Sequence, residues 1–209
     1  IILISCNGLF HRSLMKGDGS DSRAQTIVFL GIGGVIAIFI ALIQGKLQFS
    51  FPIFLIWNFI LLVVLSTPAY LLTYRSYQLI GASEVVLFLT TGRLWNVVGA
   101  TLFLHESITA IKVFGAIIIL VGIGIVLYDK KKFTLNKGVI FALLAAFLFG
   151  MSDINGYYIL QKISAANFLI YAELLPVIAL LFIQPKIVKK LTYYFKKDKV
   201  IKVFALGLF

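Results

Sequence analysis

Residues 84–128 read EVVLFLTTGRLWNVVGATLFLHESITAIKVFGAIIILVGIGIVLY, and this stretch decides the fold class. Two apolar runs, 84–104 and 110–128, are joined by the short polar link 105–109. Each run approaches the roughly 20 residues that an α-helix needs to cross the hydrocarbon core of a bilayer. The stretch therefore predicts a transmembrane helical hairpin that carries Arg93 inside its first arm.

The rest of the chain is similarly apolar. Of its 209 residues 61% are hydrophobic, and the mean hydropathy is +1.04, whereas soluble domains are about 45–50% apolar. The composition predicts an all-α polytopic membrane protein. A net charge of +11 would suggest a nucleic-acid partner for a soluble protein, but lysines in membrane-protein loops set orientation instead. The single cysteine, Cys6, supports neither a disulfide framework nor a zinc cluster.

Hydropathy and helix breakers predict seven to eight spans. We expect them at 1–11, 27–45, 53–74 (extending to about 80), 84–104, 110–128, 137–160, 166–184 and 200–209. The first and last are partial, so we expect a fragment that is cut inside a span at both ends. The runs are long and continuous and lack the alternation of transmembrane β-strands, which favours a helical bundle.

Positive charge is distributed unevenly among the loops. The loops after the first, third, fifth and seventh spans carry nearly all lysines and arginines, whereas the others carry only Lys46, Lys112 and Lys162. Because basic loops stay on the cytoplasmic side, this bias predicts that the first set faces the cytoplasm. The lysine-rich segment 185–199 is expected to be a solvated basic face that can touch anionic lipid.

Three charged residues, Arg93, Asp153 and Glu173, stand out because they lie away from the ends of predicted spans. A charge at mid-membrane depth costs about 2.5–3.5 kcal/mol on insertion scales, so such residues usually face the protein interior and mark function. Arg93 is a candidate for a structural ion pair with either carboxylate, or for a bidentate grip on a substrate carboxylate. Asp153 or Glu173 is a candidate proton carrier, since burial favours the neutral carboxyl. The sequence leaves these alternatives open.

Other polar residues share helical faces with these charges. Asn96 lies three residues after Arg93, and Tyr157 lies four residues after Asp153. Tyr70 and Tyr74 belong to a stripe of phenols on the third span, for which a cavity lining and plain packing are equally supported. The predicted substrate-binding residues are Tyr70, Tyr74, Arg93, Asn96, Asp153, Tyr157 and Glu173.

The sequence contains no recognisable catalytic or metal-binding motif. The pair His105-Glu106 lacks the second histidine of an H-E-x-x-H zinc site. The chain has only two histidines, and neither can be combined with a serine and an aspartate into a Ser/His/Asp catalytic triad. The sequence predicts a protein that is not an enzyme and that needs no cofactor or metal.

The hairpin resembles the EamA-type domain of the drug/metabolite transporter superfamily. The residues that carry the resemblance are Leu104, Glu106, Thr109, Gly115 and Gly122, which stand at the family spacing. We expect structural roles for them: Glu106 anchors the turn, and Thr109 caps the next helix. The family often has a proline in the middle of the fourth span, where this chain has Thr91-Gly92-Arg93, so no family role transfers to Arg93.

The resemblance also implies two five-span repeats with inverted or tandem symmetry. Residues 1–128 would form the first repeat, 129–136 a basic loop, and 137–209 the start of a second repeat, with about three further spans beyond. Gly150 lies in the run 138–150, which is similar to the opening helix of a repeat. Aligning Gly8 with Gly150 sets His11 against Asp153. Ten-span relatives usually keep both termini in the cytoplasm, which disagrees with the charge bias; the bias is large, and we follow it.

The resemblance implies a secondary transporter that moves a small metabolite outward across the cytoplasmic membrane by alternating access around a midplane site. The expected partners are the substrate and the lipid bilayer, with proton coupling as a plausible addition. A membrane scaffold or sensor that transports nothing is the alternative. The substrate, the coupling ion and the oligomeric state stay open.

Overall fold

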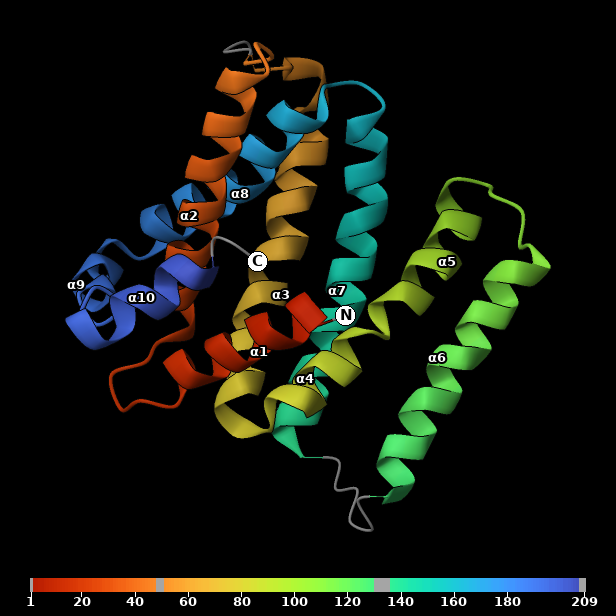
Figure 1. The fold of residues 1–209 in the computed structure, drawn as a ribbon. Coiled ribbons are helices and arrows are strands. Elements are labelled where there is room, and N and C mark those ends of the chain that lie inside the picture. Colours follow the sequence, from red (N-terminus) through yellow and green to blue (C-terminus); the bar gives the residue numbers. More distant parts are fainter. Residues whose placement is uncertain (1, 48–50, 130–135, 207–209) are drawn as a thin grey trace.

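The computed structural model describes residues 2–47, 51–129 and 136–206, and this part of the chain is a bundle of α-helices (Figure 1). The helices are α1 (Ile2–Met15), α2 (Ser22–Ile43), α3 (Ile56–Leu79), α4 (Ala82–Leu89), α5 (Gly92–Phe103), α6 (Ala110–Asp129), α7 (Lys137–Leu160), α8 (Ala165–Ile183), α9 (Val188–Leu191) and α10 (Lys197–Leu206), with 3-10 turns at Ile53–Leu55 and Pro185–Ile187. Most of the basic loop predicted at 129–136, Lys130, Lys131 and Lys132 included, lies outside the described residues.

Among the described residues, five segments are long and apolar enough to cross a membrane: Ser22–Ile43, Ile53–Leu79, Ala82–Phe103, Lys137–Leu160 and Ala165–Ile183. A shorter apolar helix covers Ala110–Ile125. The prediction of an all-α, multi-pass membrane protein is confirmed. The count of seven to eight spans is not, because within the described residues α1 has 14 residues and α10 has 10.

Side-chain caps fix where several helices begin. The Asp21 carboxylate accepts hydrogen bonds from the backbone N–H groups at the start of α2, and Asn136 and Ser164 do the same for α7 and α8. These residue types satisfy N–H groups that have no partner inside a helix. At α6 the Thr109 hydroxyl accepts from the N–H of Lys112 at 3.4 Å, the position that the sequence predicts for a cap.

The predicted span 84–104 is not one continuous helix. The hydroxyls of Thr90 and Thr91 donate to the carbonyls of Leu87 and Phe88, both at 2.6 Å, and the following N–H groups bond three residues back. Threonine hydroxyls compete with the backbone in this way and tighten the last turn. The break divides the span into α4 and α5 and places Arg93 in the first turn of α5.

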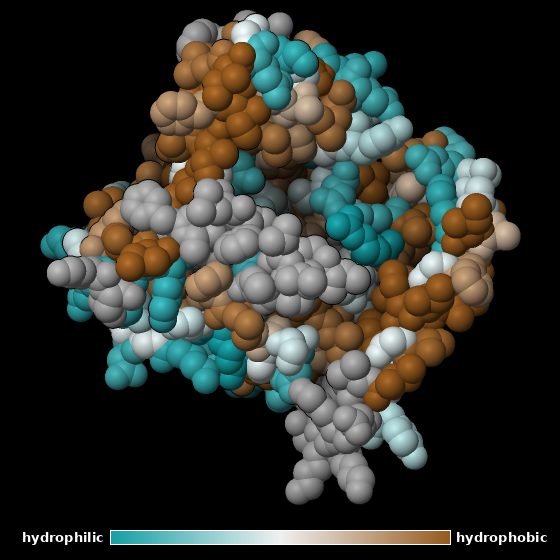
Figure 2. All heavy atoms as spheres, viewed as in Figure 1, coloured by the Kyte–Doolittle hydropathy of each residue, from teal (hydrophilic) through white to brown (hydrophobic). Residues whose placement is uncertain are grey.

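The long helices pack around α3, which contacts α2, α7 and α8. Asn58 of α3 and Asn155 of α7 join these helices, because the Asn58 amide donates to Asn155 Oδ1 at 2.9 Å and Asn155 donates to the Asn58 carbonyl at 2.8 Å. By contrast, α6 stands at the edge of the bundle beside α5 (Figure 1). The surface around it in Figure 2 is largely hydrophobic, as expected for a helix that meets lipid.

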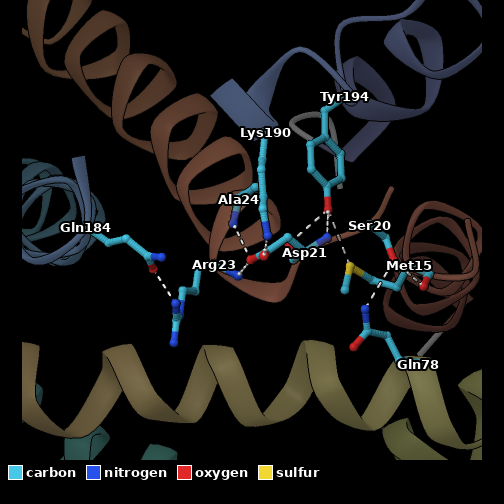
Figure 3. A network of polar contacts seen from close by, with 9 residues as sticks. All are labelled: Met15, Ser20, Asp21, Arg23, Ala24, Gln78, Gln184, Lys190 and Tyr194. Atoms are coloured by element: carbon cyan, nitrogen blue, oxygen red, sulfur yellow. Dashed lines mark hydrogen bonds and ion pairs between the residues drawn. The ribbon is translucent and has the colours of Figure 1, made fainter. Parts of the chain in front are cut away.

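One end of the bundle is closed by a polar network between two segments far apart in sequence (Figure 3). The Asp21 carboxylate accepts from Lys190 Nζ at 2.6 Å, and the Tyr194 hydroxyl donates to the Asp21 carbonyl at 3.0 Å. Arg23 also donates to the Gln184 side chain. We call this end, with turns 16–21 and 80–81 and segment 185–196, the basic end. The turns 104–109 and 161–164 lie at the opposite end.

Candidate functional site

A cavity of about 610 Å³ opens among α3, α5, α7 and α8. We call it the polar cavity. Its polar and charged lining residues are Ser66, Tyr70, Arg93, Asn96, Glu106, Ser152, Asp153, Tyr157 and Glu173. Figure 2 shows the face of the molecule hollowed between the upper helices, with hydrophilic residues bordering the recess. Six of the seven predicted substrate-binding residues therefore lie around one space, although they come from four helices.

Arg93 of α5 and Asp153 of α7 lie next to each other on the lining of the polar cavity. Arg93 Nη1 lies 4.0 Å from Asp153 Oδ2, and the Asn96 amide donates to the same oxygen at 3.0 Å. The Arg93 side chain is 74% exposed and the Asp153 side chain 56%. Of the two carboxylates that the sequence offered as partners, Asp153 makes the ion pair in the described structure. The guanidinium and the carboxylate both remain accessible to a solute.

Two glycines let α5 and α7 bring these groups together. A Cβ atom on Gly150 would lie 2.6 Å from Trp95 Cβ and 3.0 Å from the Gly92 carbonyl oxygen. A Cβ on Gly92 would in turn lie 3.1 Å from the Ala146 oxygen. Such close approach between membrane helices depends on small residues. Asp153 follows Gly150 by almost one helical turn, so it faces α5 where the two helices are closest.

Glu173 occupies a different wall of the cavity, on α8. Its Oε2 atom is buried and accepts no hydrogen bond from the described residues, and the same is true of Asn96 Oδ1. Gly33 of α2 makes room for the carboxyl group, since a Cβ there would lie 3.0 Å from Glu173 Oε2. Ser66 Oγ on the same cavity is also buried without a partner, so among the described residues the polar cavity presents three such oxygens. An unpaired buried polar group is costly unless a ligand, a proton or water satisfies it.

The predicted tyrosines divide between two cavities. Tyr157 lines the polar cavity and is 49% exposed. Tyr74 is buried and lies instead in a second cavity of about 340 Å³, which we call the aromatic cavity. Tyr70 borders both. The lining of the aromatic cavity is Asn7, Gly8, His11, Phe29, Tyr70, Thr73, Tyr74, Tyr77, Val86, Leu89, Thr90, Arg93 and Phe149.

Several lining residues were not among the predicted site residues. Ser66 and Ser152 are buried on the polar cavity, but serines inside spans carry little sequence signal. Phe149 borders both cavities and was hidden among the 19 phenylalanines of the chain. The repeat alignment pairs His11 with Asp153, but His11 was not among the predicted site residues. In the structure the His11 Nδ1 atom lies 3.1 Å from Gln25 Nε2.

Of the residues of the family pattern, Leu104 and Glu106 line the polar cavity, whereas Thr109, Gly115 and Gly122 line neither cavity. Glu106 Oε2 accepts from Lys112 Nζ at 2.7 Å and so ties the 104–109 turn to the start of α6. A Cβ on Gly115 or Gly122 would meet nothing within 4 Å. Gly150, in contrast, is tightly enclosed. In the described part of the chain, no group of three or more His, Cys, Asp or Glu residues is placed to hold a metal ion.

The fold and the site define a class: a multi-pass helical membrane protein with a polar, charged cavity inside its bundle. The chain matches the EamA-like transporter family over residues 7–128, more than half of its length, and it belongs to that family. Members are membrane transporters of the drug/metabolite type rather than enzymes, which implies a small-molecule substrate. A search of curated proteins finds no match.

Proposed function

We propose that the protein is a secondary transporter that exports a small metabolite across the cytoplasmic membrane through the polar cavity. The observation that carries the proposal is the gathering of Arg93, Asp153 and Glu173 around one space inside an apolar bundle. Charges in a membrane interior usually line a substrate or ion path. A volume of about 610 Å³ is also within the range of small-molecule sites.

The proposed binding mode uses opposite charges on facing walls. Arg93 would hold an anionic group of the substrate in place of its contact with Asp153, while Asn96 and Tyr157 supply further polar contacts. Glu173 would receive a proton or a cationic group, because its buried Oε2 lacks a donor. Segments 1–128 and 137–209 would act as two repeats that rock around this site, and the basic end would face the cytoplasm.

The test replaces Arg93. We expect Arg93→Ala to abolish export while the protein level in the membrane stays the same. Cells that express the wild-type chain or the variant are compared by mass spectrometry of the medium, with membrane protein quantified by immunoblot. Thr101→Ala on the same helix, which is not among the cavity-lining residues, is the control. Normal export by Arg93→Ala, or loss of the protein itself, would overturn the proposal.

A second candidate function is a scaffold or sensor in which the Arg93–Asp153 contact only holds α5 to α7. The 4.0 Å ion pair is the observation that favours it. The double variant Arg93→Asp with Asp153→Arg separates the two functions. If the swap restores both folding and activity, the pair is structural; if it restores folding but not export, the charges have a role in transport that depends on their positions.

A further inference from the structure

The polar cavity and the aromatic cavity meet at three shared residues: Tyr70, Arg93 and Phe149. The rings of Tyr70 and Phe149 are in edge-to-face contact, with centroids 4.8 Å apart and an interplanar angle of 81°. This arrangement is the favoured geometry of an aromatic pair. The two rings project from α3 and α7, so a small displacement of one helix against the other would separate them.

The two cavities extend from this contact in opposite directions along the bundle. The polar cavity continues to Leu104 and Glu106 at the 104–109 turn, and to Leu160 before the 161–164 turn. The aromatic cavity continues along the later part of α3, to Thr73 and Tyr77, toward the basic end. In Figure 1 the connection between α7 and α8 lies at the top of the bundle, whereas the turn between α3 and α4 lies toward the bottom and α9 lies at the left.

The chemistry of the aromatic cavity differs from that of the polar cavity. Rings of His11, Phe29, Tyr74 and Tyr77 line it, and Arg93 at the shared boundary is its one charged lining residue among those described. Two of its oxygens, Asn7 Oδ1 and Thr73 Oγ1, are buried without hydrogen-bond partners in the described structure. A space of this kind suits a planar or apolar group that carries a hydrogen-bond donor.

We propose that the aromatic cavity is a second binding compartment of the transport path, and that the Tyr70–Phe149 pair closes the passage between the compartments. The aromatic compartment takes the planar or apolar part of a substrate whose charged group binds at Arg93. Arg93 reaches both compartments because it stands at the break between α4 and α5. This inference rests on the proposed transport function and adds to it a substrate class and a closing pair.

Labelling of single cysteines tests the closure without knowledge of the substrate. In a Cys6→Ser background, Ser66→Cys reports on the polar compartment and Thr73→Cys on the aromatic one. Both positions lie on α3, seven residues apart and on the same helical face. The probe is a charged, membrane-impermeant methanethiosulfonate, added to either side of sealed vesicles that contain the full chain.

We expect each cysteine to react from one side only, and the two from opposite sides. Reaction from the other side requires a minor conformation and should be at least about tenfold slower. Phe149→Ala should remove this difference, so that both cysteines react from both sides. Phe147→Ala is the matched control, because Phe147 lies on the same helix but contacts Trp95, at 5.0 Å between centroids, outside both cavities.

Unchanged sidedness in Phe149→Ala overturns the closing role of the pair, and so does a Thr73→Cys that reacts from neither side. If Phe149→Ala is poorly folded by size-exclusion chromatography in detergent, Phe149→Leu replaces it and should give a smaller change in the same direction. The labelling pattern does not depend on export. Unchanged sidedness in Phe149→Ala together with intact Arg93-dependent export contradicts this inference alone, whereas failure of the export test contradicts the proposed function.

Discussion

The position of Arg93 depends on Thr90 and Thr91, which immediately precede α5, as well as on its charge. The Thr90 and Thr91 hydroxyls bond to carbonyls of the preceding turn, and the helix restarts at Gly92. Members of the family often have a proline in this region. In this chain Thr90, Thr91 and Gly92 interrupt the helix instead. Arg93 is thereby held at the boundary of both cavities, where a straight helix would present its side chain differently.

Glu173 is the residue that we expect to carry a coupled proton. Its Oε2 is buried beside Gly33 with no donor in the described structure. Glu173→Gln keeps the shape but cannot exchange a proton at neutral pH. We predict that in vesicles a pH gradient no longer drives export by this variant, while exchange of substrate across the membrane continues. Export that still follows the gradient would show that Glu173 is not the coupling group.

Asp21 should make the stability of the basic end depend on pH. Burial opposes the carboxylate charge, but the hydrogen bond and charge of Lys190 and the N–H groups of Arg23 and Ala24 outweigh burial, so the pKa of Asp21 lies below its ordinary value of 3.8. A group whose pKa is lowered by folding stabilises the protein above its unfolded pKa, and this stabilisation is lost as the pH falls through the folded pKa.

The corresponding variant is Asp21→Ala. Loss of an N-cap typically lowers the free energy of unfolding by about 1 kcal/mol, and loss of the Lys190 contact adds to this. We expect thermal unfolding in detergent to show the deficit at pH 7, and a smaller one at pH 3. Asp18→Ala, an exposed carboxylate in the same turn, is the control and should change little. An equal deficit for Asp21→Ala at both pH values would contradict the conclusion that the ionised Asp21 carboxylate stabilises the folded protein.

At the scale of elements, the approach of α5 to α7 builds the site. Gly150→Ala would place a methyl group 2.6 Å from Trp95 Cβ, and we expect the free energy of unfolding to fall by about 1–3 kcal/mol. Gly124→Ala in α6 meets nothing within 4 Å and should leave stability unchanged or raise it by up to about 1 kcal/mol. Thermal unfolding in detergent measures both, and equal effects would show that α5 and α7 are not closely packed there.

Parts of the element pattern follow from the sequence because they depend on local properties. Apolar length predicts the spans, and Thr109 stands where a cap is needed. The break at Thr90–Thr91 was not predicted, because threonines are tolerated inside helices and only the hydrogen bonds made by their hydroxyls reveal the interruption.

The sequence predicts which residues line the site, but it does not predict how those residues are arranged relative to one another. The cost of charge in lipid gathers Arg93, Asp153 and Glu173 inside the bundle, whatever the crossing angles are. Which carboxylate pairs with Arg93 depends on how closely α5 and α7 approach, and hence on Gly92 and Gly150 acting together. Tyr74 shares a stripe with Tyr70, yet it enters the other cavity because the stripe runs along α3 past the contact of Tyr70 with Phe149.

At the scale of the whole molecule, the proposed transport path runs between the two ends of the bundle through both cavities and past the charged residues between them. The basic end carries the Asp21 network and the lysine-rich segment 185–196. In the proposed orientation, which follows the bias of positive charge, this end faces the cytoplasm. The polar cavity extends toward the opposite end. An outward-moving substrate would therefore pass the aromatic cavity first and the polar cavity second.

The most direct test of this account is transport by the purified protein. Vesicles that contain the full chain are loaded with a small-molecule extract of the expressing cells, and the retained solutes are measured over time by mass spectrometry. We predict that at least one solute with an anionic group leaves the wild-type vesicles and stays in vesicles that contain Arg93→Ala at equal density. Identical retention in wild-type, Arg93→Ala and protein-free vesicles would contradict the claim that this protein transports a metabolite through the polar cavity.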